Sequence, residues 1–173
     1  MSSAEDVPDR SGLTTEALNK ATVELDALPT VQALALIGRE DRCIHDAIAG
    51  AQQSIANAID AIAERLARGG RLLYVGAGTS GRLGVLDAVE CPPTFQCAPD
   101  QVQGILAGGK GAMFQSVEGA EDSGAEAAKE LEALGLNEND VVFGITAGGT
   151  TPFVHGAIAS GQRAGALTVF FAC

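Results

Sequence analysis

One short segment of the sequence combines glycines with hydroxyl side chains: Gly76-Ala77-Gly78-Thr79-Ser80-Gly81-Arg82. Glycines let a backbone turn sharply and approach an anion, and the first N–H groups of a helix are unpaired donors. Thr79 and Ser80 add hydroxyl donors. The stretch from Gly78 to Gly81 therefore predicts a phosphate site between a strand and a helix, although such a turn also serves dinucleotides or close packing without a ligand.

Two common nucleotide-binding motifs do not fit this segment. The lysine and the spacing of GxxxxGK[ST] are absent, and Arg82 stands where GxGxxG has its third glycine. These differences weaken the case for a nucleotide as the ligand.

A second segment of similar design is Thr146-Ala147-Gly148-Gly149-Thr150-Thr151-Pro152. It follows an apolar run, and Pro152 suits the first turn of a helix. Two such loops after neighbouring parallel strands converge on the crevice where open α/β sheets bind ligands. Four residues of the second loop are therefore expected to bind the same ligand as the first: Thr146, Gly148, Gly149 and Thr150.

Three carboxylates are candidates for acid–base chemistry: Glu90, Glu118 and Glu121. Glu90 lies beside Pro92-Pro93, which we expect to stop a helix, and the partial negative charge of a helix end suits a protonated general acid. Glu121 lies near the start of the next predicted helix, where the opposite charge suits an anionic base. Glu118 is one turn earlier and is expected to bind the substrate. The alternative for each is a solvated surface position.

The order of predicted elements places both loops in an α/β fold. An apolar stripe including Ile48, Ile55 and Leu66 predicts a helix that Gly69-Gly70 ends. Strands are expected at 71–75, 102–107, 141–146 and 167–172, and helical stretches at 80–91, 111–118, 122–134 and 152–164. This alternation predicts a parallel sheet covered by helices on both faces.

The chain is expected to comprise three parts. Residues 1–12 predict a flexible tail, and residues 13–70 predict a helical segment, interrupted at Pro29, that packs on the sheet domain or on a partner. Residues 71–173 form the sheet domain. The last strand reaches the final residue with no helix after it, so we expect this domain to be truncated at the C-terminus, or its edge to be covered by a partner subunit.

The predicted helix that carries Glu90 creates a distance problem. From Ser80 to Glu90 it spans roughly 15 Å, which one monosaccharide hardly bridges. We therefore hypothesise that Glu90 reaches the site of a neighbouring subunit, in a homodimer with the active site at its interface.

Composition excludes several classes of partner. The net charge is −11 and the pI is near 4.4, which disfavour nucleic acid and anionic membranes. Four cysteines without CxxC spacing favour a reduced, cytoplasmic setting and no metal. The two histidines, His45 and His155, are expected in surface or packing positions. No apolar run predicts a membrane span, and residues 1–10 do not resemble a signal peptide.

The chain resembles the N-acetylmuramic acid 6-phosphate etherases, a family built on the SIS (sugar isomerase) domain. The likeness runs from Leu13 to the last residue. It rests on TEALN at 15–19, ELD at 24–26, ED at 40–41, YVGAGTSGRLG at 74–84, LDAVECPPTF at 86–95, AGG at 107–109 and VEGAED at 117–122.

This resemblance implies a carbon–oxygen lyase of peptidoglycan recycling that removes D-lactate from N-acetylmuramic acid 6-phosphate and leaves N-acetylglucosamine 6-phosphate. It implies that Glu90 and Glu121 are the catalytic pair, and that the loop from Gly78 to Gly81 holds the sugar phosphate. No metal or nucleotide cofactor is implied. In the ring-opened sugar the C1 aldehyde acidifies the C2 proton, so that one carboxylate removes this proton and the other protonates the departing ether oxygen.

The second loop departs from the family pattern, Ala-Ser-Gly-Arg-Thr-Pro. Here Ala147 is followed by Gly148-Gly149-Thr150-Thr151-Pro152, so the serine and arginine are missing, and Lys20 stands where proline is usual. Threonine does not replace a guanidinium. Two alternatives share the fold: a noncatalytic sugar-phosphate sensor like glucokinase regulatory protein, and an aldose–ketose phosphate isomerase. Lactate release distinguishes both from an etherase.

Overall fold

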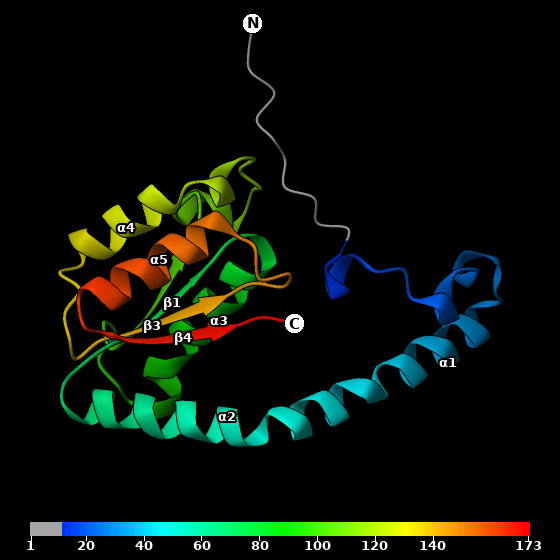
Figure 1. Cartoon of the computed structure of the whole chain (residues 1–173), viewed down its shortest axis with the longest axis horizontal. Coiled ribbons are helices and arrows are strands. Elements are labelled where there is room, and N and C mark those ends of the chain that lie inside the picture. The colour runs from blue at the N-terminus through cyan, green and yellow to red at the C-terminus, as the bar shows by residue number, and fades with distance from the viewer. Residues whose placement is uncertain (1–11) are drawn as a thin grey trace, which may run out of the picture. The chain divides into compact units, whose positions relative to one another are not determined.

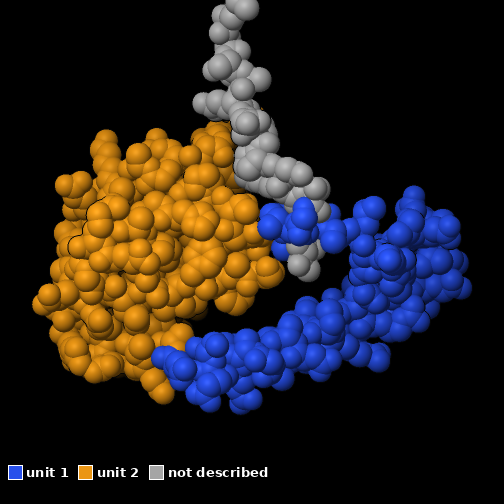
Figure 2. Space-filling model, in the orientation of Figure 1, with its two compact units in different colours: residues 1–57 blue, residues 58–173 orange. Residues whose placement is uncertain are grey.

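The computed structural model describes residues 12–173, so nearly all of the predicted tail, 1–12, lies outside the described residues. Two compact units are distinguished: one up to Asn57 and one from Ala58 to Cys173. Figure 2 colours them separately, and the boundary falls inside helix α2 (Arg42–Ala67). The predicted packing of residues 13–70 on the sheet domain stays a prediction.

The first unit contains short helical elements. Three 3-10 turns, η1 (Thr14–Glu16), η2 (Lys20–Thr22) and η3 (Leu25–Ala27), precede α1 (Thr30–Glu40) and the first part of α2. Asn19 caps η2 by accepting from the N–H of Ala21 at 2.9 Å, and its amide donates to Glu40 at 2.7 Å. A helix after Pro29 is thus confirmed, whereas the piece before it forms only 3-10 turns.

The second unit is built on four parallel strands in the order β2-β1-β3-β4. They are β1 (Leu72–Gly76), β2 (Val102–Leu106), β3 (Val141–Ile145) and β4 (Leu167–Phe171). The strand that starts the sheet lies in its interior, with β2 on one side and β3 on the other. The strand order therefore reverses between β1 and β3, and such a switch point opens a crevice at the carboxyl ends of the strands.

Helices cover both faces of this sheet, as the sequence predicts (Figure 1). On one face, β-strand residues such as Leu73 and Val142 pack against α4 (Gly124–Ala133) and α5 (Pro152–Arg163), through Leu131 and Phe153. On the other face, strand residues pack with Ala88 of α3 (Gly78–Phe95) and with the end of α2. Successive residues of a strand point to opposite faces of the sheet, so each five-residue strand contributes side chains to both helical layers.

Two predicted helix boundaries are wrong in ways that bear on the site. Residues 111–118 form no α-helix: a 3-10 turn, η4 (Lys110–Met113), leads into an irregular loop. Gly109 and Gly119, with φ of 70° and 72°, bound this segment, so at most nine residues lie between two positions that a helix cannot include. The next helix follows η5 (Ala120–Asp122) and begins only at Gly124.

Helix α3 continues through Pro92-Pro93 to Phe95, although we expected it to stop there. Prolines lack an N–H and so leave two earlier carbonyls without helical donors, but their φ is helical and the chain need not turn away. The helix ends at Gln96, which adopts a left-handed conformation with φ 55° and donates its N–H to the carbonyl of Pro92 at 2.9 Å.

A buried ion pair joins the amino ends of β1 and β3. Asp140 is 1% exposed and accepts from the guanidinium of Arg71 at 3.0 and 2.6 Å, from the Arg71 backbone N–H at 3.0 Å and from Asn137. Arg71 also donates to the carbonyls of Leu134 and Gly135. This cluster lies at the end of the sheet opposite to the crevice.

Candidate functional site

The turn from β1 into α3 leaves a set of unpaired N–H groups. Strand β1 ends at Gly76, Ala77 precedes the helix without a side chain that could cap it, and α3 begins at Gly78. Among the described residues, no backbone acceptor pairs with the N–H groups of Gly78, Thr79 and Ser80. The predicted order of strand, glycine turn and helix is confirmed, and the helix starts two residues earlier than expected.

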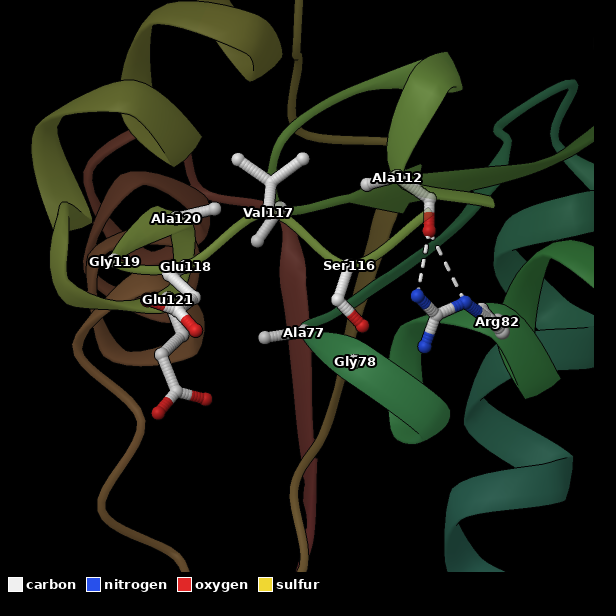
Figure 3. A pocket seen from close by; sticks show the side chains of 11 residues that line it. Ala77, Gly78, Arg82, Ala112, Ser116, Val117, Glu118, Gly119, Ala120 and Glu121 are labelled. Atoms are coloured by element: carbon white, nitrogen blue, oxygen red, sulfur yellow. Dashed lines mark hydrogen bonds between the residues drawn. The ribbon is translucent and has the colours of Figure 1, made fainter. Parts of the chain in front are cut away.

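A cavity of about 280 Å³ lies beside this turn. Its wall comes from the start of α3, from the residue after β2 and from the loop 112–121 (Figure 3). Eleven residues line it: Ala77, Gly78, Arg82, Ala107, Ala112, Ser116, Val117, Glu118, Gly119, Ala120 and Glu121. The structure therefore brings together three of the predicted site residues, which are Gly78, Glu118 and Glu121.

The two carboxylates come from one short loop. Gly119, with φ 72° and ψ −6°, turns the chain between Glu118 and Glu121, and both side chains are exposed at the pocket. Glu121 lies in η5, two residues before Ser123, whose hydroxyl accepts from the N–H of Glu126 at 3.3 Å and caps α4. Glu121 thus lies close to the start of a helix, as predicted.

The structure does not place Glu90 in this cavity. Glu90 is exposed on α3, roughly 18 Å along the helix from Gly78 at the usual rise per residue. Five helical residues follow it, so the prediction that it stands at a helix end is wrong, and the dipole argument for Glu90 as the acid no longer holds. Three of its exposed neighbours on α3 are apolar, Leu83 at 57%, Leu86 at 52% and Val89 at 57%, and Asp87 is exposed beside them.

The second predicted loop also lies at the carboxyl ends of the strands, but it does not line the cavity. Gly76 pairs in register with Ile145, so Thr146 follows directly beside the first loop. None of Thr146, Gly148, Gly149 and Thr150 lines the cavity. Thr146 is buried and its hydroxyl pairs with that of Thr151 at 2.9 Å, while His155 pairs with the carbonyl of Gly149 at 2.7 Å. Internal bonds thus occupy much of this loop.

Sequence reasoning missed two pocket residues, Arg82 and Ser116. Arg82 could have been noticed, because it is the only cation next to the glycine segment. Ser116 carried no such signal, because it lies in a stretch that we expected to be helical.

Within residues 12–173, no group of three His, Cys, Asp or Glu side chains could hold a metal ion, and no helix is both long and apolar enough to cross a bilayer.

The parallel sheet, its switch point and the glycine turn before α3 define an open α/β domain whose candidate site lies at the carboxyl ends of the strands. The family model of the N-terminal SIS domain of glucokinase regulatory protein matches residues 54–162, and the chain belongs to this family. Solved structures agree on the fold. Phosphoheptose isomerases from Neisseria gonorrhoeae and Francisella tularensis both superpose with a TM-score of 0.63 at 16% and 19% identity, over 82% and 84% of this chain and 73% and 75% of theirs.

More similar relatives are named N-acetylmuramic acid 6-phosphate etherase. The one from Thermosynechococcus vestitus is 51% identical over 100% of this chain and 56% of its own length. Those from Streptomyces avermitilis and Mycolicibacterium smegmatis are 52% and 50% identical over 93% and 95% of this chain, and over 52% and 55% of their own lengths. The chain thus spans about half the length of the curated relatives it matches, and the predicted resemblance to these etherases is confirmed.

Proposed function

We propose that the protein cleaves the lactyl ether of N-acetylmuramic acid 6-phosphate, releasing D-lactate and N-acetylglucosamine 6-phosphate. The observation that carries the proposal is one cavity lined both by Gly78, the first residue of α3, and by two carboxylates from the loop before α4. Thr79 and Ser80 follow Gly78 just outside the lining, and no backbone acceptor pairs with the N–H groups of these three residues. The chain is 51% identical, over its whole length, to a protein named for this reaction, and this similarity supports the same conclusion.

In this proposal the start of α3 binds the 6-phosphate. The N–H groups of Gly78, Thr79 and Ser80 are unpaired, and the positive end of the helix dipole favours an anion there. The exposed Thr79 and half-buried Ser80 add hydroxyl donors. These local donors hold a phosphate even though the whole chain carries a net charge of −11.

The sugar carbons then lie toward the carboxylates. In the open-chain sugar the aldehyde at C1 makes the C2 proton acidic, and Glu121 removes it as the general base. Glu121 takes the role of base because it lies close to the start of α4, whose dipole favours a carboxylate there, and Glu90 is left as the acid. Protonation of the ether oxygen by Glu90 lets lactate leave as the C2–C3 double bond forms, and water adds to that bond at C3. The sum of elimination and hydration is one water consumed and one ether bond broken.

Glu90 reaches the sugar only if it comes from a second copy of the chain. Its position on α3, outside the cavity of its own chain, supports this part of the proposal, as does the exposed apolar surface formed by Leu83, Leu86 and Val89 around it. We therefore propose a homodimer in which each α3 supplies its glutamate to the partner's pocket.

The proposed function predicts that Glu121→Gln lowers the rate of lactate release by about 10² to 10⁴, the usual contribution of one acid–base group. The measurement is D-lactate, followed with D-lactate dehydrogenase, after the whole protein is given N-acetylmuramic acid 6-phosphate. Glu132→Gln is the matched control, because Glu132 is an exposed acid on α4 outside the cavity, and it should retain full activity.

The same assay distinguishes the alternatives. A wild-type protein that binds the sugar phosphate and leaves it unchanged would be a sensor, and one that converts an aldose phosphate to a ketose phosphate without lactate would be an isomerase. Either result contradicts the proposal.

A further inference from the structure

Arg82 is the one basic side chain among the eleven residues that line the cavity. It leaves the first turns of α3 and reaches the opposite wall, where its Nε donates to the carbonyls of Ala112 and Met113, both at 3.1 Å. One terminal nitrogen, Nη2, donates to the carbonyl of Ala112 at 2.7 Å. These bonds hold the guanidinium in one orientation across the loop wall.

No protein carboxylate neutralises this cation within residues 12–173. The ion pairs found there join Arg68 to Glu64 and Arg71 to Asp140, whereas the acceptors of Arg82 are uncharged carbonyls. Its other terminal nitrogen, Nη1, has no hydrogen-bond acceptor among these residues. In Figure 3 this third nitrogen, the lowest of the three in the view, points away from Ala112.

A half-buried guanidinium that has no carboxylate partner favours an anionic ligand, even in a pocket that also contains acidic side chains. Glu118 and Glu121 face the same cavity, and a sugar phosphate brings further negative charge, so a cation is needed to offset the repulsion between them. Arginine presents several N–H donors in a planar fork that matches phosphate and carboxylate oxygens. The bonds to the wall already fix that fork, so little side-chain entropy remains to be lost on binding.

We infer that Arg82 binds an anionic group of the ligand through its Nη1 edge and thereby determines ligand selectivity. The inference rests on the proposed function, because it assumes that the cavity takes a sugar phosphate. Two anionic groups of that substrate share the required chemistry: the 6-phosphate and the carboxylate of the lactyl ether. The lactyl carboxylate is absent from the product sugar, so binding measurements can separate the two.

The test is the Kd, by calorimetry in the Glu121→Gln background, where the substrate is turned over too slowly to disturb the titration. Three ligands are compared: N-acetylglucosamine 6-phosphate, N-acetylmuramic acid 6-phosphate and unphosphorylated N-acetylmuramic acid. Arg82→Gln should weaken binding about 10- to 100-fold, the range for a hydrogen bond to a charged group, and Arg82→Lys should recover part of the loss. Arg163→Gln is the control with the same change in charge, because Arg163 bonds Ser160 outside the cavity, and its Kd values should stay within about twofold of wild type.

The pattern of losses identifies the group that Arg82 binds. Equal losses for both phosphorylated sugars assign Arg82 to the phosphate, and losses confined to the two sugars with a lactyl group assign it to the carboxylate. Unchanged Kd values for all three ligands in folded Arg82→Gln protein overturn the inference.

A second measurement covers the case in which Arg82→Gln does not fold. In wild-type protein, saturating sugar phosphate should protect Arg82, but not Arg163, from phenylglyoxal, as read by mass spectrometry. Equal modification of Arg82 with and without ligand overturns the inference. Lactate release by wild type is scored separately. Binding that depends on Arg82 without lactate release refutes the proposed function alone, and lactate release with binding independent of Arg82 refutes this inference alone.

Discussion

The glycines at the start of α3 have two different structural roles. Gly78 has φ 54° and open space around it, so its lack of a side chain serves the backbone conformation at the cavity. Gly81 is buried, and a Cβ there would lie 2.4 Å from the carbonyl oxygen of Gly76 and 2.6 Å from a methyl group of Leu106. Gly81 therefore lets α3 approach β1 and β2 closely, and so fixes where its unpaired N–H groups lie.

We accordingly expect Gly81→Ala to lower the free energy of unfolding by about 2 kcal/mol or more, because a backbone carbonyl cannot move aside as a flexible side chain can. Urea denaturation followed by circular dichroism measures this change. Gly50→Ala is the control, since Gly50 lies on α2 with nothing within 4 Å of the added methyl group. It should be neutral or stabilise by up to about 1 kcal/mol. Equal stability of the two variants would contradict the packing role of Gly81.

The strands that carry the two loops are tied together at their other ends by Arg71 and Asp140. Burial alone would raise the pKa of Asp140, but hydrogen bonds from Arg71 and Asn137 outweigh it and hold the pKa below its usual value. A carboxyl group with a depressed pKa contributes stability that is present above its unfolded pKa, near 4, and is lost as the pH falls through its folded pKa. Arg71 and Asp140 directly precede Leu72 and Val141, the first paired residues of β1 and β3, so the ion pair joins the two strands where their register begins.

Asp140→Asn should therefore destabilise the protein at pH 7 by about 3 kcal/mol, because it leaves the buried part of Arg71 without its counter-charge. The difference in unfolding free energy between wild type and variant should shrink as the pH is lowered below about 4. Denaturant titrations from pH 7 to pH 3 measure it. Asp60→Asn, at an exposed position of α2, should show no comparable difference at any pH, and a wild-type advantage that stays constant down to pH 3 would refute the assigned role of Asp140.

Over the whole molecule, the two proposed catalytic groups lie on different surfaces of one chain. Glu121 lines the cavity, whereas Glu90 is exposed on α3 with Leu83, Leu86, Asp87 and Val89 exposed near it. In a symmetric dimer, the same surface of each subunit meets its counterpart, so a residue that faces the partner can complete two identical sites. The proposed dimer follows from this separation.

Complementation tests that arrangement. Glu90→Gln and Glu121→Gln proteins should each be inactive alone, and a co-expressed mixture should regain about a quarter of the wild-type activity, because half of the dimers are mixed and each has one intact site. D-lactate release is the measurement. A double variant with both substitutions, co-expressed with Glu121→Gln, is the control and should stay inactive. A mixed population without regained activity, or a fully active dilute monomer, would contradict the shared site.

Much of the fold was predictable because its signals are local. Apolar runs bounded by glycine and proline indicated all four strands to within one residue, and the stripe from Ile48 to Leu66 indicated α2. Predictions failed where local signals were weak or were overridden by packing. The pair Pro92-Pro93 did not stop α3, and the segment between the positive-φ glycines at 109 and 119 forms a 3-10 turn and a loop in place of the expected helix.

The sequence by itself determined the α/β class, the glycine turn between a strand and a helix and the family to which the chain belongs, because periodicity, turn chemistry and motifs are properties of neighbouring residues. Only the tertiary structure decided which residues line the cavity. It joined Arg82 and Ser116 to Glu118 and Glu121. It left Glu90, the second loop and three residues of the first loop, Thr79, Ser80 and Gly81, outside the cavity lining. Contacts between residues that are distant along the chain depend on strand order and on how closely helices pack, and no spacing within one segment encodes them.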